Sequence, residues 1–229
     1  MTMRSKEKEL IDLGPDFYTP EEYLDCLKKL FRVNKLLGVF RDTKKLLKTC
    51  SKQATLLDIG CGNGLFLLNL SRHFPQMQML GVDINKEAIA AAKKALHGWN
   101  KNNLKQQLAF KAVDFKTVIN TGHFDILLAT LFCHHLNDEE LIEFLHHSYH
   151  HAKEAVVIHD LHRHWLAYGL YKFISPWLFR NRLITHDGLI SIKRGFTRSE
   201  WKVFLANAGV SNYQLKWCWP FRWQLTLRK

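Results

Sequence analysis

Short apolar runs alternate with longer segments of helical periodicity through the middle of the chain. The runs have the length and composition of buried strands, and the segments between them repeat their apolar residues at helical spacing. The runs predict strands over residues 55–60, 77–84, 108–115, 124–132 and 154–161. The segments predict helices over residues 64–74, 85–100 and 138–152. This alternation is typical of an α/β protein with a doubly wound, mostly parallel sheet.

The N-terminal part of the chain shows only helical periodicity. Thr19 has the position of an N-cap, Pro20 that of the first helical residue, and Glu21 and Glu22 stand in the first turn. The free N–H groups and positive dipole at a helix start favour these residue types. A second helix is predicted over residues 41–50, so two extra helices precede the α/β core.

The pattern after the fifth predicted strand is less regular. Residues 162–179 read as a helix that breaks at Pro176, and Thr197 with Glu200 forms a capping box for a further helix. Two final strands, as a hairpin, would complete a seven-stranded, Rossmann-like sheet. We expect a single domain (1–229) with an N-terminal helical cap (1–50), an α/β core (51–160), a helical lid (161–196) and a C-terminal helix with strands (197–229).

The composition narrows the class of protein. The 229 residues include 33 Lys and Arg against 21 Asp and Glu, a formal net charge of +12. Such an excess fits nucleic acid, an anionic membrane surface or an anionic substrate. The cysteines are odd in number and widely spaced, and the N-terminus lacks a signal peptide's apolar core. We expect a cytoplasmic protein without bound metal and with reduced thiols at Cys26, Cys50, Cys61, Cys133 and Cys218.

Candidate binding residues follow the predicted strands, because ligands of parallel sheets bind at the carboxyl ends of the strands. Gly60, Gly62 and Gly64 follow the first strand in "LLDIGCGNG". Their spacing differs from the dinucleotide fingerprint GxGxxG, and the lysine of a P-loop is missing. Asp83 ends the second strand, where a carboxylate can bind ribose hydroxyls, and Asp114 ends the third. These residues indicate a nucleoside ligand without a strong phosphate anchor.

The stretches "LLDIGCGNG", "GVDIN", "AVDF" and "FDILLATLFCHHL" resemble motifs I to IV of the class I S-adenosylmethionine-dependent methyltransferases in order and spacing. The resemblance covers residues 55–160. It implies S-adenosylmethionine as the cofactor and S-adenosylhomocysteine as the product, and this cofactor carries no phosphate. More weakly, "RVNKLLG" and "HDGLISIKRGFT" resemble the ubiquinone- and menaquinone-biosynthesis-like group (methyltransferase type 11/12). That second resemblance implies a small hydrophobic acceptor, methylated at oxygen.

The resemblance also implies roles for individual residues. Asp58 and Gly60 would lie against the amino-acid part of the cofactor, and Asp83 would bind its ribose. Ile84 would pack on the adenine, and Leu131 would line the methionine side. The complete set of implied cofactor contacts is Asp58, Gly60, Cys61, Gly62, Asp83, Ile84, Asp114, Phe115 and Leu131.

Three histidines are candidates for catalysis. His134 and His135 follow the fourth predicted strand, and His159 lies in the last part of the fifth. Histidine titrates near neutral pH, so each could take a proton from the acceptor or orient it. Alternatively, these histidines are packed or solvated and have no catalytic role.

The segment 161–196 is rich in aromatic residues interleaved with Arg and His. Together with the N-terminal helices it should cover the open ends of the strands, which suggests an aromatic or lipid-like acceptor. Arg163, Arg194 and His186 would pair with an anionic group of the acceptor or with acids of the fold.

Other functions stay open at this stage. The charge favours a nucleic-acid methyltransferase, but "TLFCHHL" replaces the Asn/Asp-Pro-Pro-aromatic motif of base methylases. This difference argues against methylation of the amino groups of bases and leaves methylation of RNA at ribose or elsewhere open, although a nucleic-acid partner is not expected. A catalytically silent, cofactor-binding partner subunit is a further alternative. We expect a small-molecule acceptor, a peripheral contact with an anionic membrane as a hypothesis, and a monomer or homodimer.

Overall fold

The computed structural model describes residues 3–99 and 107–229. The strands form one sheet and are β1 (Thr55–Ile59), β2 (Gln78–Asp83), β3 (Leu108–Ala112), β4 (Phe124–Thr130), β5 (Ala152–Leu161), β6 (Tyr213–Cys218) and β7 (Arg222–Arg228). The α-helices are α1 (Pro20–Leu36), α2 (Val39–Leu47), α3 (Leu65–Ser71), α4 (Lys86–Gly98), α5 (Phe115–Thr121), α6 (Asp138–His151), α7 (Trp165–Leu178), α8 (Arg182–Arg194) and α9 (Arg198–Asn207). Short 3-10 helices are η1 (Leu10–Asp12), η2 (Pro15–Phe17) and η5 (Cys133–His135).

The strand order across the sheet is β3-β2-β1-β4-β5-β7-β6. β1 is parallel to both of its neighbours, and Leu57 lies opposite Leu80 of β2 and Leu127 of β4. β7 lies between β5 and β6 and runs antiparallel to both. The predicted seven-stranded, mostly parallel sheet with a final hairpin is confirmed. The order changes direction between β1 and β4, which is the switch point where open α/β sheets bind ligands.

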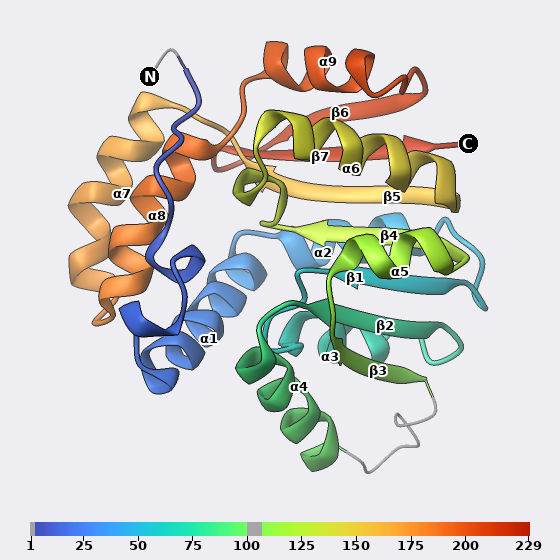
Figure 1. The fold of residues 1–229 in the computed structure, drawn as a ribbon, viewed down its shortest axis with the longest axis horizontal. Helices are drawn as coiled ribbons and strands as arrows, with labels where there is room; N and C mark the ends of the chain where they lie inside the picture. The colour runs from blue at the N-terminus through green and yellow to red at the C-terminus, as the bar shows by residue number, and fades with distance from the viewer. Residues whose placement is uncertain (1–2, 100–106) are drawn as a thin grey trace.

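Helices cover both faces of this sheet (Figure 1). α5, α6 and α9 pack on one face, around buried residues such as Phe144 and Trp201. α2, α3 and α4 pack on the other face, where Leu47, Leu67 and Ile89 are buried. The central strands are therefore apolar on both faces, as expected for parallel strands enclosed by helices.

Reciprocal capping boxes set the starts of three helices. Thr19 and Thr197 accept hydrogen bonds from the N–H groups of Glu22 and Glu200, and those glutamates bond back to the cap residues. Asn137 forms the same capping box at α6. Each reciprocal pair satisfies two N–H groups that the helix itself cannot, so these starts follow directly from the local sequence.

Several predicted boundaries differ from the observed ones, and two of them show a physical reason. The third strand ends at Ala112 rather than at residue 115, because Asp114 turns into an N-cap and accepts a hydrogen bond from the N–H of Lys116. α7 continues through Pro176 to Leu178, since the ring falls in the last turn of the helix. Asn100, at the end of the helix predicted over 85–100, lies outside the described residues.

The N-terminal segment, α1 and the α7–α8 pair gather beyond the carboxyl ends of the parallel strands (Figure 1). A small third core joins them, with Tyr23 and Cys26 from α1, Ala88 from α4, and Leu183 and Ile184 from α8. The N-terminal segment crosses α8, and α7 lies on the far side of α8 from the sheet. This arrangement encloses the open end of the sheet.

Candidate functional site

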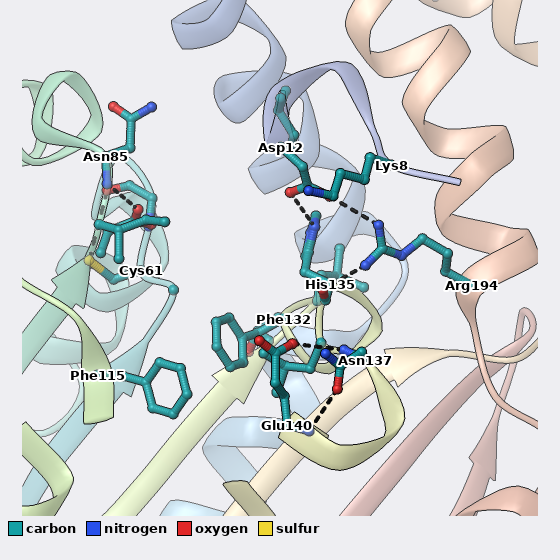
Figure 2. A pocket seen from close by; sticks show the side chains of 18 of the residues that line it. Lys8, Asp12, Cys61, Asn85, Phe115, Phe132, His135, Asn137, Glu140 and Arg194 are labelled. Atoms are coloured by element: carbon teal, nitrogen blue, oxygen red, sulfur yellow. Dashed lines mark hydrogen bonds and ion pairs between the residues drawn. The ribbon is translucent and has the colours of Figure 1, made fainter. Parts of the chain in front are cut away.

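A cavity of about 1640 Å³ lies at the carboxyl ends of β1, β2 and β4. Its walls come from the loops after these strands, from α1, from the N-terminal segment and from Arg194 at the end of α8. Figure 2 shows Cys61 and Asn85 at one end and Lys8 and Arg194 at the other. Small-molecule pockets usually measure about 300–1,000 Å³, so this cavity has room for more than one ligand.

The glycine turn between β1 and α3 forms one wall of the cavity. Gly60, Gly62 and Gly64 have φ values of 68°, 54° and 69°, in the left-handed region that other residues avoid. Gly64 also has no room for a side chain, because an added Cβ would lie 2.5 Å from the ring of Phe110. At Gly62 the same atom would meet only Leu27 of α1, at 3.4 Å. The turn therefore packs tightly at its far end and is open toward the cavity in its middle.

Asp83 lies at the end of β2, beside this turn. Its carboxylate accepts hydrogen bonds from the N–H groups of Gly62 and Asn85, both at 2.9 Å. Burial raises the pKa of Asp83, and these two donors partly offset the effect. The next residue, Ile84, is 75 % exposed and lines the cavity. The pair thus presents a fixed oxygen acceptor next to an open apolar surface.

Asp58 lies deeper, on β1, and is almost completely buried at the cavity wall. Burial and the nearby charge of Asp83 raise its pKa to about 8. We find no hydrogen bond or ion pair to this carboxyl group among the described residues. A buried acid without a partner on the wall of a cavity is well placed to receive a cation or a hydrogen-bond donor of a ligand.

Aromatic and apolar residues line the centre of the cavity. The ring of Phe132 meets Phe115 edge-on at a centroid distance of 5.2 Å, and Figure 2 shows both rings beside the opening. Leu131 has a φ of 54°, a strained value for a branched side chain, and its N–H donates to the carbonyl of His159 at 2.8 Å. Asp114 is exposed and lines the rim.

His135 lines the end of the cavity opposite Asp83. Its Nδ1 lies 2.9 Å from Asp12, and Arg194 binds both Asp12 and the carbonyl oxygen of His135. Burial lowers the pKa of His135, but Glu9 and Asp12 outweigh it and raise the pKa to about 9. The imidazole is therefore cationic at neutral pH and is paired with the carboxylate of Asp12.

His134 points away from the cavity, into the protein. It is buried, with Nδ1 at 2.8 Å from Asp160 and Nε2 at 3.5 Å from Glu9. Glu9, His134 and His135 each offer a ligand atom within 4.8 Å of the others. The contacts of these residues with Asp160 and Asp12 make the group an anchor that joins the N-terminal segment to the core.

The structure does not support a catalytic role for His159. Its buried Nε2 lies 3.0 Å from Thr43 of α2, and the residue does not line the cavity. Burial and the charge of Arg222 lower its pKa to about 4, so it is neutral. His159 lies on the face of β5 that packs against α2. The hydrophobic pattern of a strand does not show which helix covers each of its faces, so the sequence did not reveal this contact.

The predicted lid was only partly right. Among its cations only Arg194 reaches the cavity, whereas Arg163 pairs with Glu200 and His186 pairs with Asp187. No residue of α7 is among the described residues that line the cavity.

The cover comes mainly from the N-terminal side of the chain. The sequence pattern did not mark the following residues as part of a site, although they line the cavity: Lys8, Asp12, Tyr18, Tyr23, Leu27, Leu30, Phe31 and Asn34. The amphipathic pattern of α1 was the available signal, but it did not say what the apolar face covers.

The sequence around this cavity is similar to that of known methyltransferases. Residues 57–158 match the model of a family described as a methyltransferase domain. This stretch contains the glycine turn, Asp83, Asp114 and the end of β4. The match and the sheet topology together are those of the class I methyltransferase fold over residues 57–158.

Individual relatives are more distant. An uncharacterised protein of Rickettsia prowazekii is 36 % identical over 81 residues, which are 35 % of this chain and 30 % of that protein. The chain therefore matches less than a third of the length of this curated relative.

Two solved methyltransferases share the fold. Human N-acetylserotonin methyltransferase in complex with S-adenosylmethionine superposes with a TM-score of 0.66 at 18 % identity, over 97 % of this chain and 59 % of that one. Magnesium protoporphyrin IX methyltransferase from Synechocystis, with bound S-adenosylhomocysteine, gives 0.62 at 16 % identity, over 97 % and 100 %.

Proposed function

We propose that this protein binds S-adenosylmethionine at the glycine-turn end of the cavity and transfers its methyl group to a small, largely apolar acceptor, at an oxygen atom. The observation that carries the proposal is the carboxylate of Asp83, held by the N–H groups of Gly62 and Asn85 beside three left-handed glycines. Carboxylates at this position of an α/β sheet bind ribose hydroxyls.

The other residues at this end fit the same cofactor. Asp58 would receive the ammonium group of the amino-acid part, which supplies the missing partner of the buried carboxyl. Ile84 and Phe115 offer apolar surface for the adenine, and Asp114 stands at the rim to accept from its amino group. Cys61 and Leu131 complete the wall.

The acceptor would occupy the rest of the cavity. Leu27, Leu30 and Phe31 of α1 make this part apolar, while His135 and Arg194 add positive charge at its end. An apolar molecule with an ionisable oxygen, such as a phenol or a carboxylic acid, matches this lining. Such an acceptor also matches the apolar character expected from the sequence.

The proposed reaction is an in-line displacement. When bound, S-adenosylmethionine supplies a methyl group on its sulfonium and leaves as S-adenosylhomocysteine. The oxygen of the acceptor forms the new C–O bond as the S–C bond breaks. Protonated His135 cannot act as a base, so we assign it the role of holding an anionic oxygen in place. α1 and the N-terminal segment keep water from the acceptor.

Calorimetric titration of S-adenosylhomocysteine tests the cofactor site. We expect micromolar binding by the wild-type protein and at least tenfold weaker binding by Asp83→Ala, because the ribose loses its acceptor. Glu21→Ala is the matched control, since Glu21 is exposed in the first turn of α1 and does not line this cavity. Equal affinities of all three proteins, or no binding by the folded wild type, would contradict the proposal.

Nucleic-acid methylation is the second candidate, favoured by the net charge of +12. A transfer assay with labelled cofactor separates the two. Methylation of phenolic or carboxylic acceptors supports the proposal, whereas incorporation into RNA alone supports the alternative.

A further inference from the structure

α7 presents its most apolar residues to solvent. Phe173 is 77 % exposed and Trp177 is 86 % exposed, whereas Ala167 and Ser175 are buried against the protein. The hydroxyl group of Tyr171 also turns inward and donates to the carbonyl of Ile184 on α8. The large exposed side chains, which we call the α7 face, are Trp165, Leu166, Leu170, Phe173, Ile174, Trp177 and Leu178.

The residues of the α7 face recur at helical spacing, so they form one continuous stripe along the helix. Single exposed apolar residues are common on protein surfaces, but contiguous patches of this kind mark an interaction site. α7 lies at the outer side of the molecule and packs on α8 (Figure 1). The described part of the chain leaves the stripe uncovered.

The turn between β6 and β7 extends the same surface. The ring of His164 stacks on Trp165 at 5.7 Å and on Phe221 at 5.2 Å. Trp217 donates from its indole N–H to His162 at 3.1 Å, and Trp219 is 76 % exposed. An aromatic surface therefore runs from the start of α7 onto the hairpin tip.

The Lys, Arg, Asp and Glu residues of the segment that contains α7 all have one sign of charge. Residues 161–186 contain four Lys or Arg and no Asp or Glu. Lys172 and Arg180 are exposed, while Arg163 and Arg182 form ion pairs with glutamates of other elements. A second copy of the chain on a two-fold axis would place like charges opposite each other, which disfavours it as the occupant.

We propose that the α7 face and the hairpin tip dock on the surface of an anionic lipid bilayer. Helices that lie in the membrane interface have tryptophan, phenylalanine and leucine on one face and lysine and arginine beside it. α7 and its flanking residues have this composition. No helix among the described residues is long and apolar enough to cross a bilayer, so the contact is with one leaflet. This inference does not depend on the proposed reaction.

Flotation of the full chain with vesicles tests the docking. We expect binding to vesicles of equimolar phosphatidylcholine and phosphatidylglycerol, and at least about tenfold weaker binding to phosphatidylcholine alone. Phe173→Ser/Trp177→Ser should lower the affinity for the mixed vesicles by about tenfold or more, because the two most exposed side chains of the α7 face are lost. Lys172→Glu/Arg180→Glu should lower it similarly and weaken its salt dependence.

Leu36→Ser is the matched control, since Leu36 is equally exposed but lies at the end of α1. Unchanged thermal unfolding of each variant shows that the substitutions act on the surface alone. Wild-type-like binding by Phe173→Ser/Trp177→Ser, or equal binding to both kinds of vesicle, would overturn the proposal. A dimer in sedimentation equilibrium that this variant abolishes, without any vesicle binding, would assign the surface to a second copy instead.

Discussion

The carboxyl group of Asp58 is buried in the folded protein, and burial disfavours its charged form. Burial and the charge of Asp83 raise its pKa to about 8 from an ordinary value of 3.8. The folded protein therefore holds this proton more tightly than the unfolded chain, and stability falls as pH rises from about 4 to 8. Binding of a cation beside Asp58 would restore part of the stability that is lost as the pH rises.

Asp58→Asn should therefore stabilise the protein and impair the site. We expect the free energy of unfolding at pH 7.5 to rise by about 1–3 kcal/mol, because the neutral amide avoids the buried charge. The gain should shrink at pH 5, and affinity for S-adenosylhomocysteine should fall at least tenfold. Urea unfolding at both pH values and calorimetry measure these effects.

Asp125→Asn is a control for which we expect the opposite change in the free energy of unfolding. Hydrogen bonds from Thr55 lower the pKa of Asp125 despite the opposing effect of its burial, so its charged form stabilises the fold. This variant should lose stability at neutral pH. A loss of stability in Asp58→Asn as well would show that Asp58 has a partner in the folded protein.

The turn between β1 and α3 shows why an element can depend on one residue. Gly64 needs a positive φ for the turn and an absent side chain for the contact with Phe110 of β3. Gly209, after α9, also has a positive φ, at 72°, but nothing lies within 4 Å of an added Cβ. A substitution at Gly209 therefore introduces backbone strain alone, whereas one at Gly64 introduces backbone strain and a steric clash of the new side chain.

Gly64→Ala should lower the free energy of unfolding by at least about 3 kcal/mol, since strain and overpacking add. Gly209→Ala should lower it by only about 1–2 kcal/mol, from strain alone. Denaturant titration of both variants measures the difference. Equal losses would mean that Phe110 moves aside without cost.

At the scale of the whole molecule, a network of charges holds the N-terminal segment against the core. His135 bonds to Asp12, His134 bonds to Asp160 and contacts Glu9, and Arg194 bridges Asp12 to the η5 backbone. The segment in turn lines the cavity opposite the glycine turn. Its attachment therefore decides whether the cavity is enclosed.

The protonation of His135 should make this attachment depend on pH. The pKa of His135 is raised from 6.5 to about 9, so its stabilising contribution is complete below about 6.5 and disappears as pH rises through about 9. Between pH 6.5 and 9.5 we expect wild type to lose about 1–3 kcal/mol more unfolding free energy than His135→Gln, which has no charge to lose. Parallel losses in the two proteins, measured by urea titration, would show that His135 is neutral throughout.

The amino-acid sequence by itself determined the order of strands and helices, the capping boxes, and the glycines and acids that follow β1 and β2. These features depend on interactions within a few residues, such as Thr197 with Glu200 or the φ values of the turn. They are therefore visible as spacing, and the family resemblance covers the same stretch.

Only the tertiary structure decided how the histidines and the outer helices are used. His135 faces the cavity while His134 meets Asp160 and His159 meets Thr43, contacts that join residues far apart in the chain. Periodicity shows that a helix has an apolar face, but not what covers it. The apolar face of α1 closes the cavity, whereas that of α7 is turned to solvent, because α7 packs its other side on α8.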